Sequence, residues 1–586
     1  MWRRHLVNSN GIMWRMGLGV ALFGMLAVVA CGPGEAPSPT STATSAPKTV
    51  TPQLVATPTP TATAVPTPTP GPKRGGTLNR FNFTDTRFGT MDPNLETSAR
   101  DVLIVSSNFN QLLRYDPLKS SELVPDMAKS WKISADGKGF VFTLRDDAKF
   151  IDGTPVTPED VVYSLRRIVG ELGAAASNTR IGPSLKQAWS GADVTGANEV
   201  TVKTTVASAM FLGQLGSANV KIVPKQVLEA TEKKLFATAA SPVGAGPFKL
   251  TKWQRDVVVE QERYQGYVTS YKEGGGLPYL DGMRTYVIKD SSAQIAAIEG
   301  GQVDLWPRYQ SLDASQGKAV KSFLGDKVIV GQYPQAGFMV QHLNMKRPVF
   351  QDTKVVKAMW VAMDRKTLNE LVFEGGLVVG AIVDPDVFPE AALPMSEVYS
   401  YPGMKEPDYA LAKKLLADAG YPNGFEVEVI VQNAGWIQDA TQVLIAGFAK
   451  AGIRAKPVVV DVAAAQKSLD TGLFDVGYVY VGGFDTPQPL EPFMAAWMTK
   501  SPRNRSGAGD PELDRMITEA GTTLDPKQRN EKIRGIQRYI YSNMSQGTIP
   551  LGVPKDVLAQ RTYVKGYAPS LTYIDGAMFD TTWLDR

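Results

Sequence analysis

Cysteine and histidine, which carry most nucleophilic and metal chemistry, are almost absent from this chain of 586 residues. Cys31 is the only cysteine, and the two histidines are His5 and His342. Zinc sites built from cysteine and histidine, two-histidine iron sites and most Ser-His or Cys-His nucleophile arrangements are therefore excluded. A glycosidase-like pair of carboxylates stays open, because 58 acidic residues always allow some pair.

Cys31 stands at the end of an apolar N-terminal stretch. Residues 16–30 are apolar or glycine, and three arginines precede them. A basic head, about 15 apolar residues and small residues before a cleavage point are typical of an export signal. The stretch is too short for a membrane span, which needs about 20 apolar residues. Residues 28–31 also resemble the lipobox of bacterial lipoproteins. We therefore expect residues 1–31 to be a lipoprotein signal peptide and Cys31 to carry a lipid; an uncleaved anchor with an incidental cysteine is the alternative.

Residues 32–72 have the composition of a disordered tether. They contain 11 prolines and 11 threonines among 41 positions, and their only charged residues are Glu35 and Lys48. Such a segment buries too little apolar surface to offset its ordering entropy, and proline favours an extended chain of about 3.1 Å per residue. We expect a stalk that holds the folded part outside the cytoplasmic membrane, in the periplasm or on the cell surface. The chain starts at Met1 or, with a more compact signal, at Met13.

Size and charge narrow the class of the folded part, residues 73–586. Without the three arginines of the signal, 59 basic and 58 acidic residues remain, so the charge balance gives no reason to expect nucleic acid as a partner. A chain of about 510 residues exceeds one ordinary domain, and two or more lobes with large cores follow. Because this part has no cysteine, its stability depends on those cores rather than on disulfides.

The most informative stretch is residues 122–168. Apolar residues alternate on both sides of an Asp-Gly turn, at Trp131, Ile133, Phe140, Phe142 and Leu144. Two strands that share one apolar face and a glycine-rich turn make a hairpin. Thr157 and Asp160 then form a capping-box pattern with Pro158 at the first helical position, so a helix is predicted to follow.

The order of residues in this stretch closely resembles the signature of the family 5 extracellular solute-binding proteins, which are peptide, dipeptide and nickel receptors of ABC importers. The matching positions are Ala128, Trp131, Asp136, Gly137, Phe142, Leu144, Arg145, Phe150, Asp152, Gly153, Pro155, Thr157, Asp160 and Val161. Further matches follow in the family's order along nearly the whole folded chain, among them 75–78, 242–248, 300–304 and 348–352. The resemblance implies an α/β, two-lobe periplasmic-binding-protein-like fold (type II, large cluster C form) with an additional subdomain in the first lobe.

The same resemblance implies the domain boundaries. The first lobe comprises 73–330, with the extra subdomain at about 110–240, the second lobe comprises 331–552, and 553–586 return to the first lobe. In the second lobe, periodicity predicts helices at 408–419, 438–451 and 461–471 and strands at 425–431, 453–460 and 474–481. Alternating helices and strands indicate crossover units on a mainly parallel sheet, which binds ligands beyond the carboxyl ends of its strands.

The strand predicted at 474–481 leads to Asp485. In peptide receptors of this family, an aspartate shortly after this strand binds the terminal ammonium of the peptide, and Asp485 stands at the matching position. A carboxylate in a closed cleft favours an ammonium partner strongly. The family usually has a tryptophan before this aspartate, whereas this chain has Tyr480, Val481, Gly482 and Gly483, which leave more space for other ligand sizes and classes. The alternative is that Asp485 supports a turn before the Thr-Pro pair that follows it.

Aromatic and basic residues complete the predicted site. Phe109, Phe338 and Trp436 lie near segments that line the cleft in relatives, where aromatic walls suit variable side chains, and each is alternatively a core residue. Arg505 can meet a carboxylate through two parallel hydrogen bonds or be a solvated surface arginine. His342, in an apolar stretch, is expected in a core or a sheet rather than as a nickel ligand. We expect no metal and no cofactor.

Together these features predict a membrane-tethered, monomeric receptor of an ABC importer. It binds peptides between two lobes and delivers them to the permease, without chemistry on the ligand. Three alternatives stay open: a receptor for a non-peptide solute such as a sugar, an opine or a nickel chelate, a sensor for a signalling partner, and an exported hydrolase that uses a carboxylate pair. No motif in the chain selects such a pair.

Overall fold

The structure is a computed structural model of the whole chain. The chain divides into two units, Met1–Thr69 and Pro70–Arg586. The structure describes residues 71–82, 92–94, 102, 104–119, 122–173, 181–230, 242–272, 276–288, 290–306, 314–334, 336–433, 435–483, 486–572 and 578–586. The predicted signal peptide with Cys31, the predicted tether up to residue 70, and Asp485 lie outside these residues.

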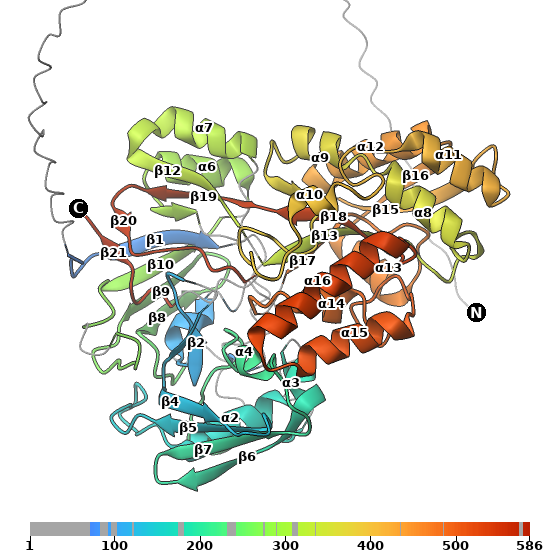
Figure 1. Cartoon of the computed structure of the whole chain (residues 1–586). Coiled ribbons are helices and arrows are strands. Elements are labelled where there is room, and N and C mark those ends of the chain that lie inside the picture. Colours follow the sequence, from blue (N-terminus) through green and yellow to red (C-terminus); the bar gives the residue numbers. More distant parts are fainter. Residues whose placement is uncertain are drawn as a thin grey trace, which may run out of the picture. The chain divides into compact units, whose positions relative to one another are not determined.

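A seven-stranded mixed sheet begins the second unit (Figure 1). Its order is β12 (Val328–Tyr333), β19 (Asp556–Arg561), β11 (Leu305–Trp306), β1 (Thr77–Asn82), β10 (Gly282–Val287), β9 (Val258–Arg263) and β8 (Phe248–Gln254). β1 runs parallel to β10 and β11, and the other neighbours are antiparallel. Helices α6 (Ser291–Glu299) and α7 (Ala314–Leu324) bury Ile298 and Val320 against this sheet, beside an edge-to-face pair formed by Phe81 and Trp306.

A separate antiparallel sheet, called the β5 sheet here, contains the predicted hairpin. Its order is β4 (Ala128–Ile133), β5 (Gly139–Leu144), β7 (Glu199–Thr204) and β6 (Trp189–Gly196), and α2 (Pro158–Ile168), α3 (Gly182–Ala188) and α4 (Phe211–Leu215) pack on it. The turn has Gly137 at φ +69°, and the Thr157–Asp160 capping box is present, so both predictions are confirmed. The shared apolar face is only half right: Phe140 and Phe142 are buried, but Ile133 is 47% exposed because the β4 side of the hairpin faces solvent.

A third sheet, the β13 sheet, has the order β14 (Leu377–Val379), β18 (Thr548–Pro554), β13 (Gly337–His342) and β17 (Tyr480–Gly483). Two connections join it to the seven-stranded sheet: β12 leads into β13, and β18 leads into β19. The strands pair on both sides of these connections, β12 with β19 and β13 with β18. Two neighbouring strands therefore pass from one sheet to the other, as in a hinge between lobes.

Helices surround the β13 sheet and contribute to the largest of the apolar cores found in the described residues. They are α8 (Thr353–Ala362), α9 (Arg365–Leu371), α10 (Met395–Val398), α11 (Tyr409–Asp418), α12 (Gly435–Lys450), α14 (Glu491–Ala496), α15 (Pro511–Thr522) and α16 (Pro526–Asn543). Helix α13 (Val462–Thr471) packs in a smaller core with Ile430 and Phe474. The predicted helices at 408–419, 438–451 and 461–471 correspond to α11, α12 and α13. Smaller elements are β2 (Leu113–Tyr115), β3 (Leu123–Pro125), α5 (Lys225–Ala230), β20 (Val564–Lys565) and β21 (Trp583–Leu584).

The predicted parallel sheet of the second lobe is only partly present. β15 (Glu426–Gln432) and β16 (Arg454–Val460) are parallel and joined by α12, as a crossover unit requires. The strand predicted at 474–481 is shorter: Val476 bridges Val429 in parallel and Leu343 antiparallel, and only β17 pairs as a regular strand, antiparallel to β13. The apolar pattern predicted the buried segment but not its partner, because burial on both faces looks alike in both orientations.

Candidate functional site

Strand β17 forms one edge of the β13 sheet. It pairs with β13 from Tyr480 opposite Val340 to Gly483 opposite Gly337. No strand pairs with its other side among the described residues, so this edge offers backbone N–H and C=O groups to an extended chain. The side chain of Tyr480 and the whole of Asp485, two residues after the strand, lie outside the described residues.

The segment that follows Asp485 is held firmly in place. The backbone N–H of Thr486 donates to the Glu491 carboxylate at 3.1 Å, and the Thr486 hydroxyl donates to the same oxygen. The Gln488 side-chain amide donates to the carbonyl oxygen of Met210 at 3.2 Å and also hydrogen-bonds Tyr115. Burial raises the pKa of Tyr115, and the Gln488 hydrogen bond opposes that shift. The segment that follows β17 thus contacts strand β2 at Tyr115 and the residue before α4, Met210.

The predicted aromatic wall is divided between core and partly exposed positions. Phe109 is fully buried in a core cluster, and Phe338 is buried with its ring 5.8 Å from that of Trp497. Trp436, in the first turn of α12, is partly exposed, and its ring meets that of Phe373 edge to face at 5.9 Å. Trp436 is the one of these three whose side chain is accessible to a ligand to any degree.

Arg505 and His342 lie near each other in the second half of the chain. The Arg505 side chain is 9% exposed and its Nε donates to Asp470 at 3.2 Å, so it is not the solvated surface arginine of the alternative prediction. His342 is buried in β13 and hydrogen-bonds Thr548 at 3.2 Å, as the core or sheet prediction required. Burial, with a smaller contribution from the Arg505 charge, lowers the pKa of His342 to about 3. The imidazole is therefore neutral at neutral pH.

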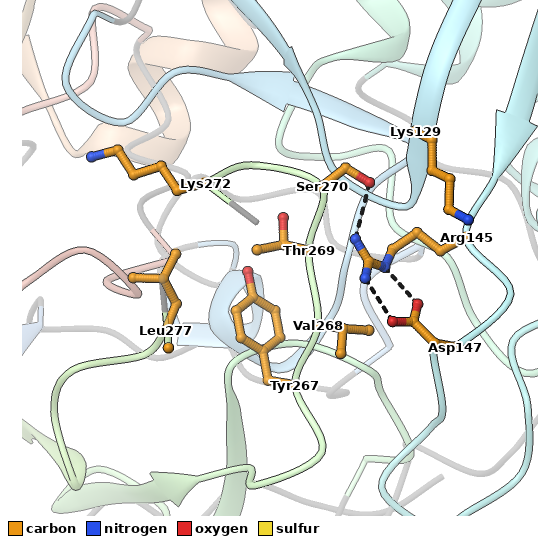
Figure 2. A pocket seen from close by; sticks show the side chains of 10 residues that line it. Lys129, Arg145, Asp147, Tyr267, Val268, Thr269, Ser270, Lys272 and Leu277 are labelled. Carbon is orange, nitrogen blue, oxygen red and sulfur yellow. Dashed lines mark hydrogen bonds and ion pairs between the residues drawn. The ribbon is translucent and has the colours of Figure 1, made fainter. Parts of the chain in front are cut away.

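A cavity of about 980 Å³ opens elsewhere, between β4, the start of the loop after β5, and residues of 267–272 and 276–277 (Figure 2). Arg145 lies on its wall, donating to both oxygens of Asp147 at 2.9 and 2.8 Å and to the Ser270 hydroxyl at 3.2 Å. Lys129 and Lys272 lie on opposite sides. None of the predicted ligand-binding residues lines this cavity, and its arginine is already neutralised by Asp147.

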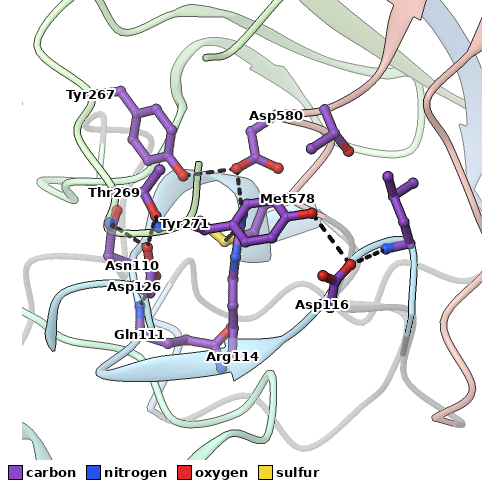
Figure 3. Close-up of polar contacts among 12 residues, drawn as sticks. Asn110, Gln111, Arg114, Asp116, Asp126, Tyr267, Thr269, Tyr271, Met578 and Asp580 are labelled. Carbon is purple, nitrogen blue, oxygen red and sulfur yellow. Dashed lines mark hydrogen bonds and ion pairs between the residues drawn. The ribbon is translucent and has the colours of Figure 1, made fainter. Parts of the chain in front are cut away.

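Below the Tyr267 wall of that cavity, a buried polar network joins four distant segments (Figure 3). Arg114 donates to Asp580 at 2.7 Å, the Tyr267 hydroxyl donates to the same carboxylate at 2.9 Å, and the Arg114 guanidinium stacks 4.9 Å from the Tyr271 ring centroid. Burial alone would lower the pKa of Arg114, but the Asp580 carboxylate raises it. The pair fastens the C-terminal segment to strand β2.

Two further ionisable groups belong to this network. Asp126 accepts hydrogen bonds from the Gln111 backbone N–H at 2.8 Å and the Thr269 hydroxyl at 2.8 Å, and burial raises its pKa. Lys221 donates to Gln111 at 3.0 Å and to the Ser106 carbonyl at 3.2 Å, and burial lowers its pKa to about 7. None of these residues is predicted from the sequence. The one usable signal is Lys221, a lysine that stands between the apolar residues Val220 and Ile222.

Within the part of the chain that the structure describes, no group of three or more His, Cys, Asp or Glu side chains is placed to hold a metal ion. No described helix combines the length and the apolar character needed to cross a bilayer.

Known proteins resemble this chain along most of its length. The model of the family "Bacterial extracellular solute-binding proteins, family 5 Middle" matches residues 122–504. The chain belongs to this family. The resemblance carried by the 122–168 signature is thereby confirmed.

Similar proteins and solved structures agree with this family assignment. Heme-binding protein A of Haemophilus influenzae is 25% identical over 79% of this chain and 84% of its own length. Glutathione-binding protein GsiB of Pectobacterium atrosepticum is 24% identical over 78% of this chain and 85% of its own. The periplasmic binding protein DppA of Helicobacter pylori, solved with the peptide STSA, superposes with a TM-score of 0.71 at 22% identity, covering 88% of this chain and 99% of its own. The family 5 protein has the two-lobe binding-protein fold.

Proposed function

We propose that this family 5 protein is the receptor subunit of an ABC importer and that its ligand is a peptide held between two lobes. Residues 73–330 together with 553–586 form the first lobe, which includes the subdomain at about 110–240, and 331–552 form the second. The paired connections from β12 to β13 and from β18 to β19 support these boundaries, because they are the segments about which the lobes can rotate. The receptor role follows from the family, and the peptide is supported by relatives named for glutathione or solved with the peptide STSA.

The observation that carries the peptide proposal is the unpaired edge of β17 followed at once by Asp485. An extended peptide adds to such an edge through backbone hydrogen bonds, which are independent of its side chains. Its terminal ammonium then pairs with the Asp485 carboxylate, a charge-assisted hydrogen bond. Tyr480, Gly483, Trp436 and Arg505 complete the proposed set of ligand-binding residues, whereas the buried Phe109 and Phe338 serve as core residues. No step of covalent chemistry is part of this function.

The first 72 residues give the receptor its location. Cys31, lipidated and left as the first residue when residues 1–30 are removed, anchors the protein to the cell membrane, and 32–72 act as a tether. The receptor works as a monomer in the periplasm or at the cell surface and docks on the transmembrane permease. This arrangement is supported by the composition of the chain and by the family of extracellular solute-binding proteins.

Native mass spectrometry of a 73–586 fragment tests the ligand class directly. Denaturation of the ligand-bound species should release peptides, which fragmentation then identifies. Release of a sugar, an opine, haem or a metal chelate would agree with the receptor role and contradict the proposal that the ligand is a peptide. An empty protein is then titrated with a panel of di- to pentapeptides and of these other solutes.

Asp485→Asn tests the ammonium contact. Breaking one side of a desolvated charge pair costs about 3–5 kcal/mol, which corresponds to a loss of several hundred-fold or more in peptide affinity. Asp439→Asn, on the exposed face of α12, is the matched control and should leave affinity unchanged. Equal affinities of the two variants would show that Asp485 supports its turn rather than the ligand.

A non-peptide solute is the second candidate, and the glycines of β17 are the observation that favours it. Gly482 and Gly483 stand where peptide receptors of the family usually carry a tryptophan, so the site has room for a bulkier ligand. The relative named heme-binding protein A has a ligand of this kind. The same mass spectrometry separates the two candidates.

A further inference from the structure

Two consecutive residues of the subdomain, Met210 and Phe211, point into different cores. Phe211 is fully buried in the core of the β5 sheet, with its ring 5.3 Å from that of Phe140. Met210 is 3% exposed and belongs to the large core around the β13 sheet. Among the described residues, every other buried member of that core comes from positions 336–551. Met210 is therefore the side chain by which the first lobe enters the core of the second.

Two hydrogen bonds with the second lobe hold the backbone next to this inserted side chain. The backbone N–H of Ala209 donates to the carbonyl oxygen of Gly521, at the end of α15, at 3.1 Å. The Gln488 side-chain amide donates to the carbonyl oxygen of Met210 at 3.2 Å. The backbone of residues 209–210 is thus held at two points by the second lobe while its side chain is buried there.

Side chains of the second lobe also lie close to two glycines near Met210. A Cβ added to Gly213 would lie 1.6 Å from the Gln488 amide nitrogen and 2.7 Å from the Tyr115 hydroxyl oxygen. A Cβ added to Gly137, in the turn between β4 and β5, would lie 2.6 Å from a methyl carbon of Leu524, which follows α15. A larger residue at either position would therefore require these side chains to move away from the first lobe.

None of these residues belongs to the two connections that join the lobes. Those connections lie between β12 and β13 and between β18 and β19. If the lobes open by rotation about these connections, residues 207–213 separate from Gln488 and Gly521, the two hydrogen bonds break and Met210 becomes exposed.

We propose that residues 207–213 form a latch that stabilises the closed receptor, and that Met210 and Gln488 are positioning residues for the ligand-binding segment after β17. The latch rests on the proposed function in one respect, closure of two lobes over a solute. Gln488 lies three positions after Asp485, so the latch holds the subdomain against the segment that contacts the ligand. The subdomain then contributes to affinity without touching the ligand, because apparent affinity scales with the fraction of closed molecules.

Disulfide trapping measures this closure without any ligand. In the full chain with Cys31→Ser, the substitutions Ala209→Cys and Gly521→Cys place the only two thiols across the latch. A mild oxidant should link them within one chain, and the linked protein should scatter X-rays as the more compact form. Adding Met210→Ala should slow linking about 10-fold or more, because the buried methionine side chain stabilises the closed state.

Control variants separate closure from general stability. Met404→Ala removes an equally buried methionine of the same core, which packs beside Gly380 of the second lobe, and should leave the linking rate within about twofold. Met210→Leu should restore the rate, because leucine fills a similar volume. If Met210→Ala unfolds the protein, Gln488→Ala, which removes only the polar contact, should still slow linking severalfold.

The results separate the latch from the peptide proposal. Equal linking rates for Met210→Ala and Met404→Ala, or no link in the parent pair, overturn the latch whatever the ligand is. Slowed linking in Met210→Ala, together with release of a non-peptide solute in native mass spectrometry, supports the latch and refutes the peptide. When peptides do bind, the linked protein should release them far more slowly than the reduced protein.

Discussion

Two buried arginines, one in each lobe, are held in opposite ways. In the first lobe, Arg114 meets the Asp580 carboxylate, and the charge raises its pKa. In the second, Arg365 is equally buried but donates to three backbone carbonyls, of Pro550, Trp360 and Gly403, and burial lowers its pKa to about 10. Arg114 is held by an anion from the far end of the chain, and Arg365 is held by carbonyl groups inside an apolar core.

This difference predicts which single substitutions cost the most stability in each lobe. Removing one member of a buried ion pair leaves an uncompensated charge. Removing one apolar side chain leaves a cavity, whose cost depends on how far its neighbours relax. The first lobe should therefore be sensitive to single charge changes, and the second lobe to single volume changes.

Asp580→Asn should have the largest effect on stability. The Asp580 side chain is fully buried, and its loss leaves Arg114 without its anion, at a cost of about 3–5 kcal/mol in the free energy of unfolding. Urea denaturation measures this loss. Asp193→Asn, which breaks half-exposed pairs with Arg166 and Lys203 on the β5 sheet, should cost less than about 1 kcal/mol. Equal losses in the two variants would remove the distinction between the lobes.

Leu551→Ala should come next. Leu551 is fully buried in β18, within the core of the second lobe, and truncation there costs about 3 kcal/mol with no dependence on pH. The control is Val459→Ala on β16, where the side chain is 55% exposed and the loss should stay below about 0.5 kcal/mol. A pH-dependent loss in Leu551→Ala would mean that the second lobe also depends on buried charges.

The same contrast explains what the sequence could predict. Apolar periodicity predicted α11, α12 and α13 and the capped helix α2, because each pattern is local and each element buries one stripe. The network of Arg114, Asp126, Lys221 and Asp580 has no such pattern, since its members are brought together only by the tertiary fold. The inserted Met210 is equally invisible, because a methionine beside a phenylalanine is read as a member of the same core.

The candidate site was predictable only where a family motif carries it. The signature at 122–168 identified the family, which the match over 122–504 confirmed. It could not predict that β17 pairs antiparallel with β13, because orientation depends on a partner more than 100 residues away. The contact of Gln488 with Met210 joins two lobes and has no counterpart in local propensity.

Lys221 should give the first lobe a characteristic dependence on pH. Its pKa is lowered to about 7 in the folded protein from about 10.5 in the unfolded chain, so between these values the unfolded state binds more protons. Stability should therefore rise with pH above 7, by about 1 kcal/mol per unit, up to about pH 9, below the ordinary tyrosine range. Lys221→Met should flatten this rise, and the exposed Lys413→Met should not.

His342 provides the matching test in the second lobe, on the acid side. Its pKa is lowered to about 3 from 6.5, so stability should fall as the pH falls through this window. Unfolding measured from pH 7 to 4 should show a shallower fall in His342→Leu than in the parent. If Lys221→Met instead changed how stability falls between pH 7 and pH 4, it would be wrong to assign the alkaline pH dependence to the first lobe and the acid pH dependence to the second.

Asp470→Asn should have the smallest effect on stability. It tests an ion pair in which only the cation is buried. Its partner Arg505 is 9% exposed, but Asp470 itself is 50% exposed, so water replaces much of what the carboxylate supplies. A loss of about 0.5 kcal/mol in urea denaturation is expected. The Arg505 charge also contributes to the lowered pKa of His342 and persists in this variant. The fall in stability between pH 7 and pH 4 should therefore occur at the same pH as in the parent. A loss near that of Asp580→Asn would instead show that burial of the cation alone decides the cost, whichever lobe holds it.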